Sequence, residues 1–292
     1  MKKAILWTVA VIITLSAAIF QRQTGPTYPK RIDVSVNGET YGIKLVRSLG
    51  LDERPVVRMA INDESVSARL FYKRFKTEDD YTSVDFTYRV IPIRSFVMNK
   101  IFRMDEMKGL FASVPRQPPA GKLQYYIEIT DEAGTQILFK DDPVVIRFKD
   151  AVPGWILTPH IILMFFAMLL STLAGLFAIA GYESQRKFGI ITLLMLFAGG
   201  MILGPLVQYH AFGEFWTGIP FGWDLTDNKT LVAVLFWILA VAMNWRRQRP
   251  AYTIVAAVVL LLIYSIPHSM FGSELDFSTG EIKQGMIMNT FF

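Results

Sequence analysis

Apolar residues are concentrated in five runs that polar segments separate. A helix needs roughly 20 residues to cross a hydrocarbon core about 30 Å thick. The second and third runs meet that length, and flanking residues lengthen the fourth and fifth, while none of these four contains Asp, Glu, Lys or Arg. Residues 155–268 are therefore predicted to form a four-helix transmembrane bundle, with helices at about 156–181, 188–208, 227–245 and 251–267.

The first apolar run, at residues 4–20, follows Lys2 and Lys3. Its length suits either the core of a signal peptide or a short anchor helix. The small residues of Ser16-Ala17-Ala18 resemble a cleavage site. Residues 1–21 are therefore predicted to be a signal peptide or an N-terminal anchor helix, and either one exports the segment that follows.

The basic residues in the short segments give the orientation. One set of alternating segments holds seven of them, whereas the opposite set holds only Lys229 and Lys283. The side with more Lys and Arg faces the cytoplasm. This predicts a bacterial inner-membrane protein with a cytoplasmic N-terminus and with residues 22–155, the 208–229 loop and the 269–292 tail outside. The seven are Lys2, Lys3, Arg186, Lys187, Arg246, Arg247 and Arg249.

Residues 25–150 have the pattern of short strands, often alternating and divided by Gly, Asn, Asp and Pro. Asn37-Gly38 suits a type I′ hairpin. We predict an extracytoplasmic two-sheet β-sandwich, so that the fold class is an all-β sandwich joined to an α-helical membrane bundle. The predicted strands are at residues 31–36, 40–46, 56–61, 68–73, 83–91, 122–129, 136–139 and 144–147.

Two segments of this region carry a family resemblance. The stretch from Gly109 to Gly134 contains Phe-Ala-Ser-Val-Pro-Arg-Gln-Pro-Pro-Ala-Gly and then Tyr125-Tyr126-Ile-Glu-Ile-Thr-Asp, and Ala68-Arg-Leu-Phe-Tyr72 lies upstream. Residues of about 66–134 thus resemble immunoglobulin-like and fibronectin-III-like domains of exported bacterial proteins. The resemblance implies a binding or spacer module without catalytic residues, and a fold alone does not assign a function.

Composition narrows the function classes. The chain has 292 residues, is 52% hydrophobic, carries a net charge of +5 and contains no cysteine, which excludes disulfides and thiolate sites. No nucleotide-binding or hydrolase motif is present. The absence of charged residues within the last four apolar runs disfavours proton relays and ion-coupled transporters. The basic residues are explained by topology, so nucleic-acid binding has no support.

The predicted outer ends of the helices carry the candidate chemistry. All three histidines of the chain, His160, His210 and His268, fall there, near an acidic and aromatic loop at residues 211–230. Imidazoles can ligate a transition metal or haem iron, and carboxylates complete or orient such a site. The metal-ligand candidates are His160, His210, His268 and Asp227, and the cofactor-contacting candidates are Trp216, Trp223 and Asp224.

Structural interpretations of the same residues are equally simple. Trp216 and Trp223 suit an aromatic belt at headgroup level, and Asp227 or Thr226 suits a helix cap. The loop distantly resembles the tryptophan-rich loop of haem-handling cytochrome c maturation proteins, but its tryptophan spacing differs.

Two functions follow from these patterns. The favoured one is a non-catalytic envelope protein in the lipid bilayer, whose sandwich and outer loops bind a protein partner. The alternative is a haem- or metal-binding membrane protein. Gly200 and Gly204 favour close helix packing inside the bundle, with a homodimer interface as the other interpretation.

Overall fold

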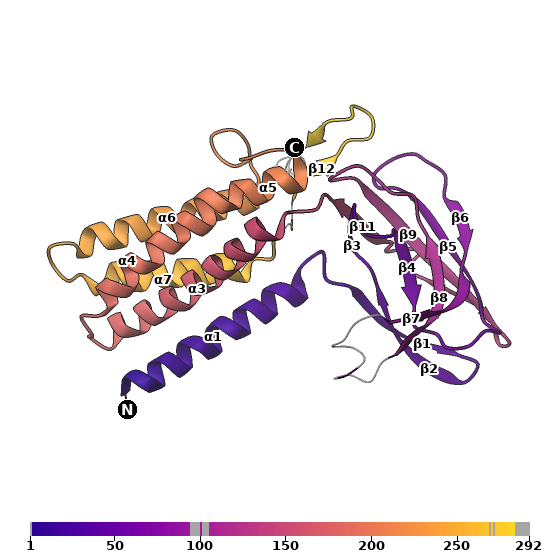
Figure 1. The fold of residues 1–292 in the computed structure, drawn as a ribbon, viewed down its shortest axis with the longest axis horizontal. Helices are drawn as coiled ribbons and strands as arrows, with labels where there is room; N and C mark the ends of the chain where they lie inside the picture. The colour runs from indigo at the N-terminus through magenta and orange to yellow at the C-terminus, as the bar shows by residue number, and fades with distance from the viewer. Residues whose placement is uncertain (1, 94–99, 101–104, 269, 271, 284–292) are drawn as a thin grey trace. The chain divides into compact units, whose positions relative to one another are not determined.

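The computed structural model describes residues 2–93, 100, 105–268, 270 and 272–283 (Figure 1). The chain forms two compact units. A helical unit comprises Met1–Pro26, Asp150–Glu274 and Ile282–Phe292, and a β-unit comprises Thr27–Lys149 and Leu275–Glu281. The chain therefore contains both helices and β-sheets, as the sequence predicts at this coarse level.

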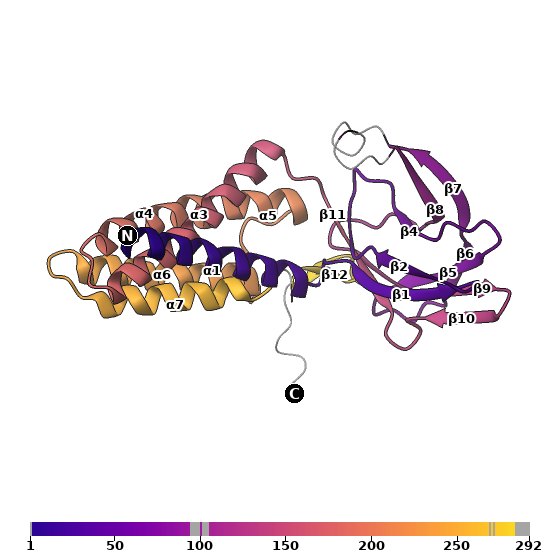
Figure 2. The same cartoon turned by 90° about the horizontal axis from the view of Figure 1, so that it is seen from below.

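The helical unit consists of apolar helices that pack along their lengths (Figure 2), with α3 contacting α1, α4 and α7. Four helical stretches, Lys2–Thr24, Gly154–Ile179, Gln185–Phe212 and Leu225–Asn244, are long and apolar enough to cross a membrane. The last helix, with 16 residues, is shorter than such a span. The helices are α1 (Lys2–Thr24), α3 (Gly154–Ile179), α4 (Gln185–Leu196), α5 (Gly204–Phe212), α6 (Leu225–Asn244) and α7 (Pro250–Ser265).

The stretch between α4 and α5 is π-helical, from Phe197 to Leu203. A Cβ atom on Gly199 would lie 2.9 Å from the Leu163 Cβ, and one on Gly200 would lie 2.7 Å from the Thr230 Cγ2. Both glycines therefore let neighbouring helices approach closely. Gly200 thus lies against Thr230 of α6.

A buried polar cluster joins α4, α6 and α7 at one end of the helical unit. Gln185 donates from Nε2 to Asn244 Oδ1 at 3.0 Å and accepts from the Thr253 hydroxyl. Asn244 Oδ1 also accepts from the Arg249 backbone N–H at 2.8 Å. These bonds satisfy polar groups that would otherwise be costly to bury.

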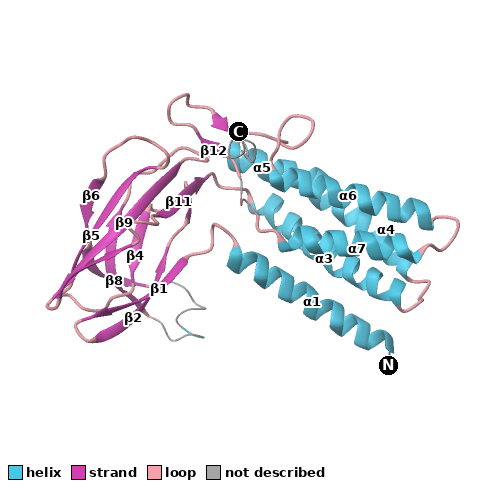
Figure 3. Cartoon of the chain, turned by 180° about the vertical axis from the view of Figure 1, so that it is seen from behind, coloured by secondary structure: helices cyan, strands magenta, loops and turns pink. Residues whose placement is uncertain are grey.

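The β-unit contains three sheets that share one hydrophobic core (Figure 3). Strands run in the order β3-β11-β9-β5-β6 in the largest sheet, where β10 also pairs with β9. The second sheet has the order β4-β8-β7, and β1 pairs with β2. The bounds are β1 Lys30–Val36, β2 Glu39–Leu45, β3 Ser48–Gly50, β4 Val56–Met59, β5 Ser67–Arg74, β6 Thr82–Asp85, β7 Thr87–Pro92, β8 Glu106–Ser113, β9 Lys122–Asp131, β10 Gly134–Leu138 and β11 Val144–Lys149.

The hairpin of β1 and β2 follows from its sequence. Val36 pairs with Glu39, so that Asn37 and Gly38 form a two-residue turn with φ values of 49° and 81°. Positive φ at both positions is what a type I′ turn requires, which confirms the prediction at Asn37-Gly38. Every second residue of each strand then points into the core, as Val34 and Val36 do in β1.

Strands β3 and β8 were absent from the sequence prediction, as were two short strands after the helices, and one predicted strand is divided. Strand β3 has only three residues. Strand β8 buries four consecutive residues, Gly109 to Ala112, so it lacks the alternation that marks a half-buried strand. The predicted strand at 83–91 is interrupted at Phe86 between β6 and β7.

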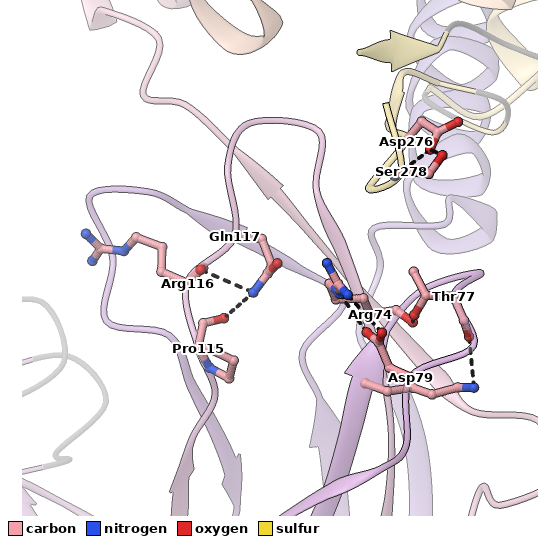
Figure 4. Close-up of polar contacts among 9 residues, drawn as sticks. Arg74, Thr77, Asp79, Pro115, Arg116, Gln117, Asp276 and Ser278 are labelled. Carbon is pink, nitrogen blue, oxygen red and sulfur yellow. Dashed lines mark hydrogen bonds and ion pairs between the residues drawn. The ribbon is translucent and has the colours of Figure 1, made fainter. Parts of the chain in front are cut away.

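The segment Leu275–Glu281, which follows the helices in sequence, belongs to the β-unit. Leu275 donates its backbone N–H to the Ala120 carbonyl at 3.1 Å, and Arg74 lies over the Phe277 ring at 5.2 Å. The Arg74 guanidinium also binds Asp79 through two bonds, at 2.6 and 2.8 Å (Figure 4). This pairing lowers the pKa of the Asp79 carboxyl to about 2. The segment lies between the short strands β12 (Glu274–Leu275) and β13 (Ile282–Lys283).

Gly109 is expected to be essential to the β4–β8 pairing. Its φ is +147°, and an added Cβ would collide with the Met59 carbonyl oxygen. Gly109→Ala should therefore lower the free energy of unfolding of the β-unit by about 3 kcal/mol, through both strain and overlap. Urea unfolding of the detergent-solubilised protein, followed by circular dichroism of the strands, measures the change.

Gly134→Ala is the matched control. Gly134 has a φ of +132° but no atom within 4 Å of an added Cβ, so only the strain term applies and the loss should be smaller, about 1 kcal/mol. Equal losses in the two variants would contradict the steric argument.

Candidate functional site

The candidate site is the loop between α5 and α6 together with the first turn of α6. Asp224 precedes α6 as its N-cap, and its Oδ1 accepts from the backbone N–H groups of Thr226 at 2.8 Å and Asp227 at 3.1 Å. A carboxylate here satisfies free amide donors and complements the helix dipole. Asp224 is buried, so its charge faces the helix end and not solvent.

Asp227 fixes the loop to the helix. Its Oδ2 accepts from the Thr217 backbone N–H at 2.6 Å and from the Thr217 hydroxyl at 3.1 Å. Gln208, on α5, donates to the same hydroxyl at 2.6 Å. The Ile219 backbone N–H also donates to the Oδ1 of Asn228 at 2.7 Å. The two ends of the loop are therefore joined through side chains that are largely buried.

A glycine in the loop makes this closure possible. A Cβ on Gly218 would lie 2.8 Å from both Asn228 Oδ1 and Asp227 Cβ. The next peptide bond but one, Ile219–Pro220, is cis. Gly218 therefore has a packing role here.

The two candidate tryptophans lie differently. Trp216 donates its Nε1–H to the Ile219 carbonyl at 3.1 Å and so belongs to the internal bonding of the loop. Trp223 is exposed, as are Phe215, Ile219 and Phe221. The loop thus turns Asp224 and, with the first turn of α6, Asp227 inward, while Glu214 and several large apolar side chains are exposed.

The three histidines occupy distinct surroundings. His160, in α3, has its Nδ1 2.8 Å from the Gly199 carbonyl oxygen, so that only its Nε2 is not used in this bond. His210 lies in the last turn of α5, with its ring 5.8 Å from that of Tyr209. His268 follows α7 and lines a cavity beside Lys229. Among the residues described, no group of three or more His, Asp or Glu side chains could hold a metal ion.

His268 and His160 are nevertheless electrostatically coupled. His268 lines the cavity, although the residue is exposed as a whole. Desolvation at the cavity wall, with the nearby Lys229 and His160, lowers the pKa of His268 to about 4. The His268 imidazole is therefore neutral at pH 7.

Lys229, in the first turns of α6, is a functional candidate that the sequence suggested only as a basic residue at the boundary of the 208–229 loop and the 227–245 helix. Its side chain is buried, and Nζ donates to the carbonyls of Ile266 at 2.9 Å and Pro267 at 3.4 Å, just after α7. Gln21 of α1 donates to the same Ile266 carbonyl at 3.4 Å. Basic groups at a helix C-terminus satisfy its free carbonyls. Lys229 and Gln21 thus connect α1, α6 and the end of α7.

A cavity of about 20 Å³ adjoins this connection. Its wall is mainly apolar and includes Met164, Leu196 and Leu260, while Lys229 and His268 supply polar groups. A cavity of this size has room for about one water molecule. Lys229 lies four residues before Ala233, on the helix face that continues to the buried Trp237 and Ala240. This spacing is visible in the sequence, but the carbonyl partners of Lys229 beyond α7 are not.

Replacing Lys229 is expected to weaken the end of α7. Lys229→Met removes the donors to the Ile266 and Pro267 carbonyls and should lower the free energy of unfolding by about 2 kcal/mol. Thermal unfolding of the detergent-solubilised protein measures the effect. Lys187→Met removes an exposed lysine and should change stability by less than about 0.5 kcal/mol. Equal effects of the two substitutions would refute the claim that Lys229 stabilises the end of α7 by bonding the Ile266 and Pro267 carbonyls.

Comparisons with known proteins add no assignment. Scans against protein families, curated proteins and solved structures found no match for this chain.

Proposed function

We propose that this chain is a non-catalytic integral membrane protein of the bacterial envelope, whose immunoglobulin-like β-unit lies outside the cytoplasm and binds a protein partner. The observation that carries the membrane part is the apolar outer surface of the helical unit. One large apolar residue from each of α1, α3, α4, α6 and α7 is between 49% and 63% exposed, and these are Ile12, Ile162, Leu194, Leu235 and Leu262.

Such exposure is unfavourable in water and neutral in lipid. Burying apolar surface is worth roughly 25 cal/mol per Å², so a water-soluble helical unit would turn these side chains inward. In a bilayer they contact acyl chains, while the backbone groups are satisfied within the helices. Four helical stretches also have the length that crossing requires.

Contacts among the basic segments support the proposed orientation. Lys3 lies over the Tyr182 ring at 5.2 Å, and Arg186 donates to the Trp245 carbonyl. The N-terminus, the segment before α4 and the segment after α6 therefore meet at one end of the helical unit. This end carries the seven basic residues, and the positive-inside rule assigns it to the cytoplasm.

The packing of α1 favours an anchor helix over a cleaved signal peptide. Ala10, Thr14 and Ala17 are buried and share one face of the helix. Ala10 packs with Leu169 and Leu173 of α3, and the Trp7 ring meets Phe188 edge-on at 5.7 Å. Removing residues 1–21 would expose this part of α3, so we propose that α1 stays attached.

The proposed partner surface lies on the β5–β9 sheet, on the face opposite the core. The Phe71 ring stacks on Tyr126 at 4.7 Å, and Tyr81 meets Tyr126 edge-on at 5.0 Å. Lys73 lies 5.3 Å from the Tyr81 ring and Lys140 lies 5.9 Å from the Tyr126 ring. Aromatic side chains with nearby cations suit an interface with an acidic partner protein.

Cysteine labelling tests the topology directly, because the chain has no cysteine of its own. Gln248→Cys, between α6 and α7, should react with a membrane-impermeant maleimide only after the cells are lysed. Ala133→Cys, in the β9–β10 turn, should react in intact spheroplasts. Labelling of both or of neither in spheroplasts would contradict the proposed orientation. N- and C-terminal tags on one full-length band would show that α1 is retained.

Photo-crosslinking tests partner binding. A benzophenone amino acid at Phe71 should capture one specific protein in intact membranes, whereas the same group at Val90, an exposed residue of β7, should not. Lys73→Glu with Lys140→Glu should lower the yield about tenfold if the partner is acidic. The control Lys44→Glu changes an exposed lysine of β2 and should leave the yield unchanged. A yield that is insensitive to the paired change would overturn this surface.

A further inference from the structure

The loop between α5 and α6 exposes apolar side chains from a closed, internally bonded backbone. Phe221 is 81% exposed, and Phe215, Ile219 and Trp223 are also exposed. The bonds of Thr217 to Asp227 and of Ile219 to Asn228 hold the loop against the first turn of α6. The outward direction of the apolar side chains is therefore part of a fixed conformation.

The exposed apolar segment of the loop, residues 215–223, has no charge of its own, although the exposed Glu214 precedes it. Residues 215–223 contain neither acidic nor basic side chains. Asp224 and Asp227, which flank this segment, are buried in backbone hydrogen bonds. A protein interface normally surrounds its apolar centre with polar and charged groups, whereas an uncharged aromatic segment suits the boundary between lipid headgroups and acyl chains.

The loop lies at the end of the helical unit where α3 begins. Asp150, four residues before α3, donates its backbone N–H to the Ala211 carbonyl near the end of α5 at 3.2 Å. Trp155, the second residue of α3, is 75% exposed. Two segments far apart in sequence thus present tryptophan or phenylalanine side chains at the same end, next to the apolar sides of the helices.

We infer that the 215–223 loop inserts its apolar side chains into the headgroup region of the outer leaflet, and that it fixes the depth of the helical unit in the bilayer. This inference rests on the membrane insertion proposed above. The occupant of the exposed surface is the phospholipid boundary, since Phe221 and Trp223 are exposed, uncharged aromatic side chains at one end of an apolar helical unit. Anionic headgroups are not required, because the segment offers no charge to them.

Spin labelling of single-cysteine variants in phosphatidylcholine vesicles tests this inference. A nitroxide at Phe221→Cys should collide with oxygen, which concentrates in hydrocarbon, and should be protected from a water-soluble nickel chelate. Ala133→Cys gives the aqueous reference and Leu235→Cys, on α6, gives the acyl-chain reference. The oxygen-to-nickel ratio at residue 221 should exceed that at residue 133 about fivefold, at a depth of about 5 Å.

The controls separate this inference from the proposed function. A lipid-exposed label at 235 with a water-exposed label at 221 would overturn loop insertion alone. A label at 221 that is shielded from both reagents would overturn it in favour of coverage by protein. A water-exposed label at 235 would overturn membrane insertion itself. Replacing phosphatidylcholine by phosphatidylglycerol should leave the depth at residue 221 unchanged, and a depth that requires the anionic lipid would contradict uncharged insertion.

Discussion

In the bilayer proposed for it, the helical unit depends on one constraint, which is that each helix end needs hydrogen-bond partners where water is scarce. Helix α7 has 16 residues, about 24 Å at 1.5 Å per residue, which is less than a hydrocarbon core of about 30 Å. The Lys229 ammonium and the Gln21 amide bind the Ile266 carbonyl beyond its end. Side chains from α6 and α1 thus supply the donors for the carbonyl just beyond the short helix α7. The end of α7 is therefore a point where α1 and α6 are joined.

The same need for hydrogen-bond partners accounts for the roles of Asp224 and Asp227. The sequence directs attention to an acidic outer face, where Asp224 and Asp227 are candidates for a cofactor site. Both carboxylates instead accept backbone N–H groups, of Thr226 and Thr217 respectively. Because these bonds occupy the carboxylates and bury them, the loop presents Phe221 and Trp223 outward. In this structure Asp224 and Asp227 thus have structural bonds, and the exposed surface beside them is aromatic.

Local patterns made much of the fold predictable. Alternation and a turn dipeptide identified the β1–β2 hairpin, and apolar runs identified the helices. Strand β8 was not predicted, because it buries Leu110, Phe111 and Ala112 in succession and so lacks alternation. Non-local contacts account for the rest: Lys229 resembles an ordinary loop lysine until α7 brings Ile266 beside it, and no spacing in one sequence reveals that His160 bonds the Gly199 carbonyl.

Contacts at both ends and in the middle of the helical unit hold neighbouring helices together, as a static scaffold would require. Gln185, Asn244 and Thr253 form a bonded cluster at one end, and Lys229 with Gln21 connects helices at the other. Between them, an added Cβ on Gly175 would lie 2.7 Å from the Ala257 Cβ, so helices cannot slide past one another without losing close packing. A rocking transporter needs helices that separate, whereas a rigid support for an exported binding module needs the opposite. The packing therefore agrees with the proposed partner-binding role, in which the β-unit meets its partner while the helices hold position.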